Sequence, residues 1–226
     1  MKNIINITLD GPSASGKTTI ARELALDLGL AYVDTGAMYR GIGYYMLSSG
    51  IDTKDAAAVE GKINDITMRI TYDNGEQRVI VNGEDVTPYI RKPEISMAAS
   101  DVGKVPAVRL KLVELQREIA KVNSCVLDGR DIGSYVLPHA EYKFYLTASD
   151  EVRAARRFAE IKDKNPGLTL EEVASDLKKR DLQDSSRSFA PLIIPNGAVY
   201  IDTSNLSLDE VKMLIKDKLY YLKHCK

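Results

Sequence analysis

Residues 11–18 read Gly-Pro-Ser-Ala-Ser-Gly-Lys-Thr, a composition and spacing suited to a phosphate-binding loop. Gly11 and Gly16 allow the backbone to curl until its N–H groups point at an anion. The Lys17 ammonium can reach the β- and γ-phosphates of a nucleotide, and the Thr18 hydroxyl can bind Mg²⁺. The segment therefore predicts a nucleoside triphosphate site.

The flanking sequence supplies the elements that this loop needs. An apolar run at 4–9 precedes it and predicts a buried strand. After the loop, Ile20, Leu24 and Leu28 fall on one stripe of a predicted helix, with Ala21 and Ala25 beside them. The positive end of this helix would face the phosphates. The order of strand, loop and helix favours a phosphate site over a glycine-rich turn that binds nothing.

A second group of charged residues follows a later apolar run. Asp128 ends that run, where an acidic side chain can orient Mg²⁺ or its water ligands. Arg130 and Asp131 then stand at the carboxyl end of a central strand, the edge at which open α/β sheets bind ligands. The alternative is a turn in which Arg130 and Asp131 pair only with each other.

Two other segments carry polar groups with both a structural and a functional interpretation. Thr35 resembles a helix cap that could also face a ligand, with Arg40 one turn further on. An ordinary cap beside a surface arginine is the alternative that these residues alone favour. Arg180, Asp184 and Arg187 suit a lid over a triphosphate, because arginine binds phosphate through two N–H groups and keeps its charge. A solvated helix end is the alternative there.

Length and composition limit the possible classes of protein. The 226 residues suffice for one α/β domain, and the net charge of −1 gives no basic field for nucleic acid. No apolar run approaches the roughly 20 residues of a membrane span, and the first strand leaves no room for a signal peptide. With two cysteines, Cys125 and Cys225, and two histidines, we expect no disulfide or zinc site and a reducing cytoplasm.

The wider pattern predicts a doubly wound α/β fold, because helical segments separate five apolar runs typical of a parallel sheet. These runs are 4–9, 31–33, 125–127, 142–146 and 198–201. Capping boxes are predicted for the pairs Thr169 with Glu172 and Ser207 with Glu210. The helix predicted at 106–123 has a stripe of apolar residues expected to be buried, namely Val108, Leu112, Leu115, Ile119 and Val122.

Two regions interrupt this alternation. Residues 67–86 alternate in polarity and contain Asn74-Gly75 and Asn82-Gly83, which predict tight turns and a small antiparallel meander. Residues 150–191 are helical and highly charged, as expected for a mobile lid. Neither region has the features of a separate domain.

Together these motifs resemble the bacterial-type cytidylate (CMP) kinases, a family of nucleoside monophosphate kinases among the P-loop NTPases. The resemblance runs nearly end to end and rests on segments 10–17, 34–40, 98–100, 128–133, 180–187 and 190–192 together with Arg109. It implies a single P-loop kinase domain at 1–226 built on a five-stranded parallel sheet. A monophosphate-binding insert at about 37–103 and a lid at about 150–191 would belong to that domain.

The resemblance implies transfer of the γ-phosphoryl group of ATP to CMP or dCMP, with Mg²⁺. We expect a cytoplasmic monomer without nucleic-acid or membrane partners. The absence of obvious acid–base residues fits an acceptor that is already an anion, since such a reaction needs positioning and charge neutralisation. A kinase for AMP, dTMP or shikimate and a nucleotide-operated switch are the alternatives. Ser100, Arg109 and Asp131 favour CMP, and no Asn-Lys-x-Asp guanine motif supports a switch.

The family also implies the roles of individual residues. ATP would be held by Gly11, Pro12, Ser13, Ala14, Ser15, Gly16, Lys17, Thr18, Thr19 and Arg157, with Arg153 and Arg156 as further candidates. CMP would be held by Thr35, Arg40, Ser100, Arg109, Arg130, Asp131, Arg180, Asp184 and Arg187. Lys17, Arg130 and Arg187 would be catalytic, and Thr18 and Asp128 would hold Mg²⁺. Many family members have Ser where this chain has Thr35, so the hydroxyl is kept and a methyl group is added.

Overall fold

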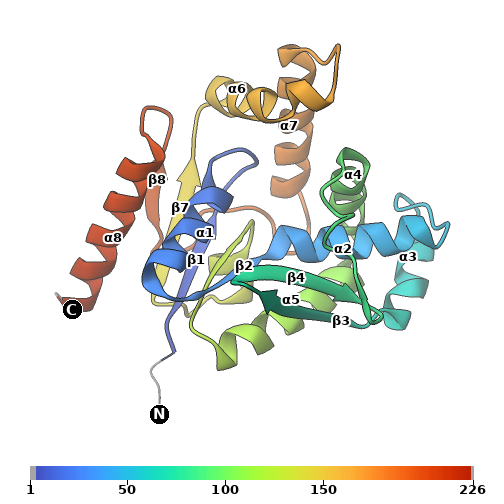
Figure 1. Ribbon diagram of the computed structural model, residues 1–226, viewed down its shortest axis with the longest axis horizontal. Helices are drawn as coiled ribbons and strands as arrows, with labels where there is room; N and C mark the ends of the chain where they lie inside the picture. Colours follow the sequence, from blue (N-terminus) through green and yellow to red (C-terminus); the bar gives the residue numbers. More distant parts are fainter. Residues whose placement is uncertain (1–3, 225–226) are drawn as a thin grey trace. The chain divides into compact units, whose positions relative to one another are not determined.

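The computed structural model describes residues 4–224 (Figure 1). They divide into two compact units, the first made of residues 4–30 and 125–224 and the second of residues 31–124. The five-stranded sheet has the strand order β2-β6-β1-β7-β8, and a separate three-stranded sheet has the order β3-β4-β5. A parallel sheet flanked by helices, with a small antiparallel sheet, confirms the predicted fold class.

The first unit contains four strands and the helices that cover them. Its elements are β1 (Asn6–Asp10), α1 (Lys17–Leu28), β6 (Cys125–Gly129), η2 (Ile132–Val136), β7 (Tyr142–Thr147), α6 (Asp150–Ile161), η3 (Lys162–Lys164), α7 (Leu170–Ser185), β8 (Val199–Asp202) and α8 (Leu208–His224). β1 is central and pairs in parallel with β6 and β7. Its Ile7 and Leu9 are buried, as are Leu127 of β6 and Phe144 of β7, so strands covered on both faces form the core.

The loop between β1 and α1 depends on glycine at its first position. Gly11 has φ +149°, and a Cβ placed on it would lie 1.9 Å from the Leu146 carbonyl oxygen of β7. A side chain here would therefore push the loop away from the sheet. Gly16, with φ +87°, precedes the first residue of α1, and the non-glycine Ala14 also has a left-handed φ, +59°.

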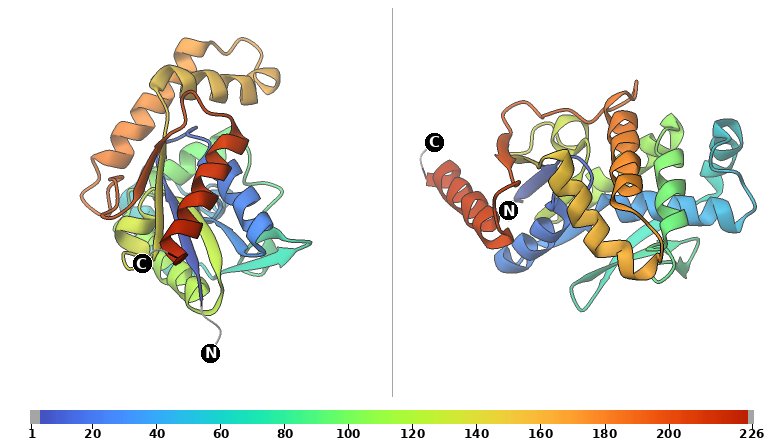
Figure 2. Two further views of the ribbon diagram at one scale, coloured as in Figure 1. Left: turned by 90° about the vertical axis from the view of Figure 1, so that its left-hand side faces the viewer. Right: turned by 90° about the horizontal axis from the view of Figure 1, so that it is seen from above.

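Helices α6 and α7 form a hairpin (Figures 1 and 2). It has a small core of its own, made by Ala154, Val173 and Leu177. Both predicted capping boxes are confirmed. Thr169 and Glu172 exchange side-chain and backbone hydrogen bonds at the start of α7. Ser207 and Glu210 do the same just before α8.

The second unit consists of short helices and the antiparallel meander. Its elements are β2 (Ala31–Asp34), α2 (Thr35–Ser48), α3 (Ala56–Lys62), η1 (Ile63–Asp65), β3 (Met68–Asp73), β4 (Glu76–Val81), β5 (Glu84–Asp85), α4 (Pro93–Val102) and α5 (Pro106–Val122). Asn74 and Gly75 turn β3 into β4 with left-handed backbones, and Asn82 and Gly83 turn β4 into β5 in the same way, which confirms both predicted turns. Gly43 lets α2 approach α4, because a Cβ there would lie 2.9 Å from the Ala99 nitrogen.

Two predicted apolar stripes end differently from expectation. Leu28 is 41% exposed and Val122 is 72% exposed, so the last residue of each stripe faces solvent. In α5 the buried residues are Val108, Arg109, Leu112, Val113, Gln116 and Ala120. The helix therefore buries a face that includes two polar side chains, which a search for apolar spacing overlooks.

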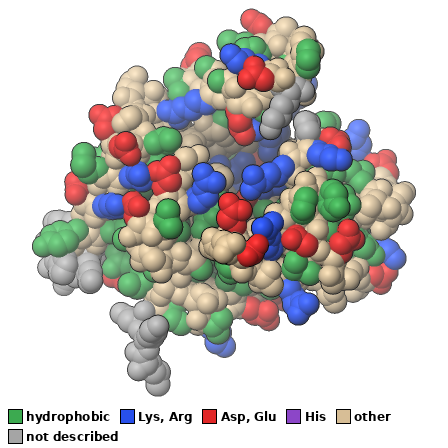
Figure 3. Space-filling view, viewed as in Figure 1, with side chains coloured by type: hydrophobic (Ala, Val, Ile, Leu, Met, Phe, Trp, Pro, Cys, Tyr) green, Lys and Arg blue, Asp and Glu red, His purple; other side chains and the backbone are tan. Residues whose placement is uncertain are grey.

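The remaining sequence expectations concern the surface and the cysteines. No helix within residues 4–224 is both long and apolar enough to span a bilayer. Acidic and basic side chains are interspersed on the face drawn in Figure 3. Cys125 is buried in β6, and burial raises the pKa of its thiol to about 12. Cys225 lies outside the described residues.

Candidate active site

The phosphate loop holds its lysine in a buried position. The Lys17 side chain is 5% exposed, and its Nζ donates a hydrogen bond to the Pro12 carbonyl oxygen at 2.9 Å. Burial, followed by the nearby charge of Arg130, lowers the pKa of Lys17 to about 7. An ammonium group in this position lacks a full counter-charge, which is the condition that a bound polyphosphate would relieve.

A hydroxyl and a carboxylate meet beside this lysine. Thr18 Oγ1 donates to Asp128 Oδ2 at 2.7 Å, although 110 residues separate the two in sequence. The contact brings together the first turn of α1 and the end of β6. A threonine hydroxyl beside a strand-end aspartate is the donor set with which P-loop proteins hold Mg²⁺, so these two residues fit that ion.

The alternative in which Arg130 and Asp131 pair only with each other does not hold, because Arg130 contacts other residues. Arg130 Nε donates to Asp184 Oδ2 of α7 at 2.8 Å, and its Nη2 donates to Ser13 Oγ at 2.9 Å. Arg187 also donates to Asp184. Burial alone would raise the pKa of Asp184, but the charges of Arg130 and Arg187 lower it, so the carboxylate stays ionised between two guanidinium groups.

Arg180 differs from these paired arginines. Its side chain makes no hydrogen bond or ion pair within the described part of the chain. Burial and the charge of Arg130 lower its pKa. The charges of Asp184 and Asp181 act on it, but its N–H donors form no direct bond, so the guanidinium is suited to an anionic ligand.

Asp10 is an important residue that the sequence reasoning left without a role. It is fully buried at the end of β1 and accepts hydrogen bonds from the backbone N–H groups of Ile132 and Gly133, each at 2.7 Å. Burial raises its pKa to about 7, against the lowering effect of these bonds. Asp10 thereby fixes the backbone directly after Arg130 and Asp131. An acid ending an otherwise apolar strand was the only local signal for it.

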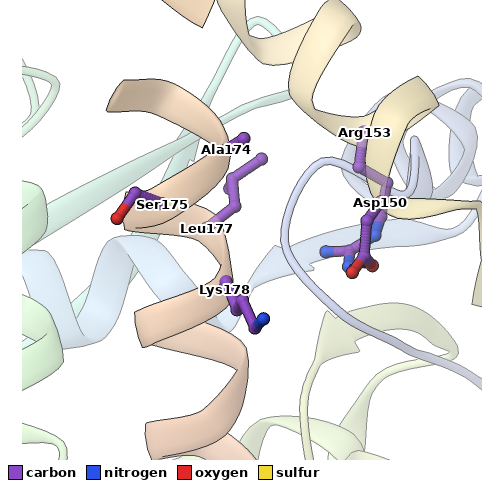
Figure 4. A pocket seen from close by; sticks show the side chains of 6 residues that line it. All are labelled: Asp150, Arg153, Ala174, Ser175, Leu177 and Lys178. Atoms are coloured by element: carbon purple, nitrogen blue, oxygen red, sulfur yellow. Dashed lines mark hydrogen bonds and ion pairs between the residues drawn. The ribbon is translucent and has the colours of Figure 1, made fainter. Parts of the chain in front are cut away.

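The three arginines of α6 have different surroundings. Arg153 is buried and donates to the Ser13 and Ala148 carbonyl oxygens. It also pairs with Asp150 and Asp181, and Figure 4 shows Asp150 and Arg153 beside a cavity of about 180 Å³ that faces Leu177 and Lys178 of α7. Arg157, the candidate for ATP binding, pairs with Glu160 at 2.9 Å on a partly exposed face. Arg156 instead donates to both oxygens of Thr203.

In the second unit, Asp34 and not Thr35 caps α2. The Asp34 carboxylate accepts from the Ala37 N–H at 2.8 Å while Asp34 itself keeps an extended backbone, so Thr35 is the first helical residue. The other carboxylate oxygen accepts from Arg40 Nη2 at 2.8 Å. Two adjacent residues can each cap a helix, and backbone conformation decided between them. The prediction that Thr35 is the cap was wrong.

The base-reading candidates of this unit lie on α4 and α5. Ser100 is partly buried on α4. Arg109 of α5 is buried, donates to the Gly103 carbonyl oxygen at 3.3 Å, and lies over the ring of Tyr39 at 5.7 Å. The site residues thus form two groups, one in each unit. The first unit holds the phosphate loop with Asp128, Arg130, Asp131, Arg180, Asp184 and Arg187, and the second unit holds Thr35, Arg40, Ser100 and Arg109.

The strand, loop and helix around Lys17 place the molecule among the P-loop nucleotide-binding proteins. The family model for cytidylate kinase matches residues 7–219. The chain is 44% identical over 216 residues to the cytidylate kinase of Caldicellulosiruptor bescii, covering 96% of each chain. It is 46% identical to that of Caldanaerobacter subterraneus subsp. tengcongensis, covering 92% of this chain and 91% of the relative. The chain belongs to the cytidylate kinase family and is a nucleoside monophosphate kinase.

One solved structure supports the fold alone. An uncharacterized protein from Eubacterium ventriosum superposes with a TM-score of 0.52 at 10% identity, over 97% of this chain and 99% of that one. At this identity the likeness concerns the arrangement of the elements and not the substrate.

Proposed function

We propose that this enzyme transfers the γ-phosphoryl group of ATP to CMP or dCMP, with Mg²⁺, and releases ADP with CDP or dCDP. The observation that carries the proposal is the phosphate loop, in which Lys17 is buried and Thr18 contacts Asp128. Membership of the cytidylate kinase family supports the choice of acceptor. Residues 1–226 would act as one cytoplasmic, monomeric kinase, with the monophosphate-binding insert at about 37–103 and the lid at about 150–191.

The chain's own residues would bind and neutralise the donor. The backbone N–H groups of the loop between Gly11 and Thr19 would receive the ATP phosphates, and Arg157 would approach them from α6. Lys17 would offset the charge that develops on the transferred group. Thr18 and Asp128 would hold Mg²⁺, which supplies charge neutralisation to the β- and γ-phosphate oxygens when bound.

The acceptor would be fixed by cations at its phosphate and by polar groups at its base. Thr35, Arg40 and Arg130 would surround the CMP phosphate, and Arg187 would neutralise the transferred group. Arg180 and Asp184 would bind the sugar, which requires Asp184 to exchange part of its pairing with Arg130 and Arg187 for hydroxyl groups. Ser100, Arg109 and Asp131 would read cytosine, whose N4 amino group donates while N3 and O2 accept.

An acceptor panel tests this proposal. ADP release from Mg-ATP is measured with CMP, dCMP, UMP, AMP, dTMP and shikimate, and without an acceptor. We expect CMP and dCMP to give the highest kcat/KM and the acceptor-free reaction to be negligible. A preference for AMP, dTMP or shikimate would overturn the choice of acceptor, and turnover independent of any acceptor would indicate a nucleotide-operated switch.

A further inference from the structure

One threonine outside the predicted site joins four segments of the first unit. Thr203 follows β8, is 3% exposed, and donates its backbone N–H to the Thr147 carbonyl oxygen at 2.8 Å. Its hydroxyl oxygen lies 2.9 Å from the same carbonyl and 3.2 Å from the Ser15 carbonyl oxygen of the phosphate loop. Arg156 of α6 donates to this hydroxyl from Nη1 at 2.9 Å and to the Thr203 carbonyl from Nη2 at 2.7 Å.

Arg156 is the α6 arginine that has no carboxylate partner. Arg153 and Arg157 each pair with acids, whereas no described carboxylate forms an ion pair with Arg156. Its charge is felt by Asp202, whose pKa is lowered mainly by hydrogen bonds from Ser204 and to a smaller extent by Arg156. Thr203 therefore holds a cation through neutral oxygens and leaves its charge without a direct counterion.

The position of the Arg156 guanidinium beside the phosphate loop suits it to bind an anion there. A Cβ placed on Gly16 would lie 4.0 Å from Arg156 Nη1, and Gly16 directly precedes Lys17. A guanidinium group has five N–H donors, of which the two bonds to Thr203 use two. The other three remain for an anion on the phosphate loop, where charge-assisted bonds are the strongest.

We propose that Thr203 is a positioning residue for ATP binding, because it aligns Arg156 beside the phosphate loop so that the guanidinium meets the triphosphate. The inference rests on the proposed function in one respect, namely that ATP is the phosphoryl donor. The Thr203 oxygen accepts from Arg156 while its single proton goes to a carbonyl oxygen of Ser15 or Thr147. Loss of the hydroxyl leaves the guanidinium attached by one bond, about which it can swing.

The first test compares Thr203→Val, which keeps the shape and removes the hydroxyl, with Thr203→Ser, which keeps the hydroxyl. Binding of Mg-ATP without acceptor is followed by calorimetry, and KM is measured for ATP and CMP separately. We expect Thr203→Val to weaken ATP binding about tenfold, in line with the loss of one charge-assisted bond, with KM for CMP within about twofold. Thr203→Ser should restore ATP binding. A lower melting temperature with unchanged ATP binding would overturn the proposal.

The second test does not depend on the folding of a Thr203 variant. Lysine at position 156 keeps the positive charge but lacks the planar guanidinium that donates to both Thr203 oxygens at once. We expect Arg156→Lys to lose as much ATP affinity as Arg156→Met. If lysine restores the affinity, charge alone suffices and the positioning role is wrong. In the double variant Thr203→Val with Arg156→Met, we expect no loss beyond that of Arg156→Met alone, whereas additive losses would contradict the coupling.

These tests separate the inference from the proposed function. ATP titration of the variants needs no acceptor, so it reports on Thr203 and Arg156 even if CMP is not the substrate. Conversely, the acceptor panel uses the wild-type chain and reports only on the reaction.

Discussion

Asp181 of α7 accepts a hydrogen bond from the backbone N–H of Ser13 in the phosphate loop, at 3.2 Å and across 168 residues of sequence. Arg153 donates to the Ser13 carbonyl oxygen at 3.1 Å and also pairs with Asp181. Both helices of the α6–α7 hairpin therefore hold the same loop residue. The resemblance made Arg153 a further candidate for holding ATP, whereas in the structure Arg153 binds the phosphate loop itself and Asp181.

Replacing Arg153 should destabilise the enzyme. Arg153→Met leaves the partly buried Asp181 carboxylate without its guanidinium, which we expect to cost about 3 kcal/mol in the free energy of unfolding. Arg157→Met, at the partly exposed pair with Glu160, is the control and should cost less than about 1 kcal/mol. Urea unfolding measures both free energies. Equal losses for the two variants would show that the buried ion pair stabilises the fold no more than the exposed one.

Replacing Lys17 should remove activity and leave the fold intact. We expect Lys17→Ala to lower kcat/KM by about 10²–10³, because a group that offsets charge on the transferred phosphoryl is lost. Since burial disfavours the charged lysine in the free protein, the melting temperature should not fall. Lys54→Ala, at an exposed position, is the control. More than a tenth of wild-type kcat/KM in folded Lys17→Ala would refute the role.

Asp131 should control the choice of base. A carboxylate facing N4 accepts from cytosine and repels the uracil O4, whereas an amide can present either a donor or an acceptor. Asp131→Asn should therefore narrow the ratio of kcat/KM between CMP and UMP, mainly by weakening CMP, because unmatched polar groups cost about 1–3 kcal/mol. Proportional losses for both acceptors would show that Asp131 does not read the base.

Asp10 should give the stability a specific pH dependence. The pKa of Asp10 is about 7 in the folded chain against its ordinary value of 3.8, so the folded state binds the proton more tightly. The stability from this group is full below about pH 4 and is lost as the pH rises through 7. Between pH 5 and 7 the unfolding free energy of wild type minus that of Asp10→Asn should fall by about 1 kcal/mol per pH unit. Urea titrations giving a constant difference would mean that Asp10 is ionised throughout.

The α6–α7 region should exchange its amide hydrogens more slowly when both substrate sites are filled. A bisubstrate analogue would engage the arginines of residues 150–191 and restrict opening of the hairpin. Strands β1 and β6 serve as internal references, because they should be protected with and without ligand. Equal protection of residues 150–191 in both states would identify this region as static structure, and exclusion of water would then need another cause.

Local patterns predicted the elements well and the contacts between distant segments poorly. The observed strands begin and end within two residues of the predicted runs. This is because continuous apolar runs and tight turns are encoded by residues that are close together in the sequence. Asp10 and Thr203 were missed since their partners lie 122 and 188 residues away in Ile132 and Ser15. No spacing rule reports such pairs. The cap of α2 was missed by one residue because Asp34 and Thr35 are both suitable caps, and only the backbone conformation separates them.

The central position of β1 in the sheet means that the ribosome synthesises this strand long before the two strands that pair with it. β1 pairs with β6 and β7, and its Asn6 lies opposite Cys125. Cys125 lies 119 positions after Asn6, so the intervening chain, which includes the whole second unit, must be translated before either neighbour exists. At about 5–20 residues per second, the apolar first strand waits on the order of ten seconds without a pairing partner. Residues 31–124 are contiguous and can pack during that time, so β1 is the apolar strand that stays unpaired in the nascent chain until β6 emerges.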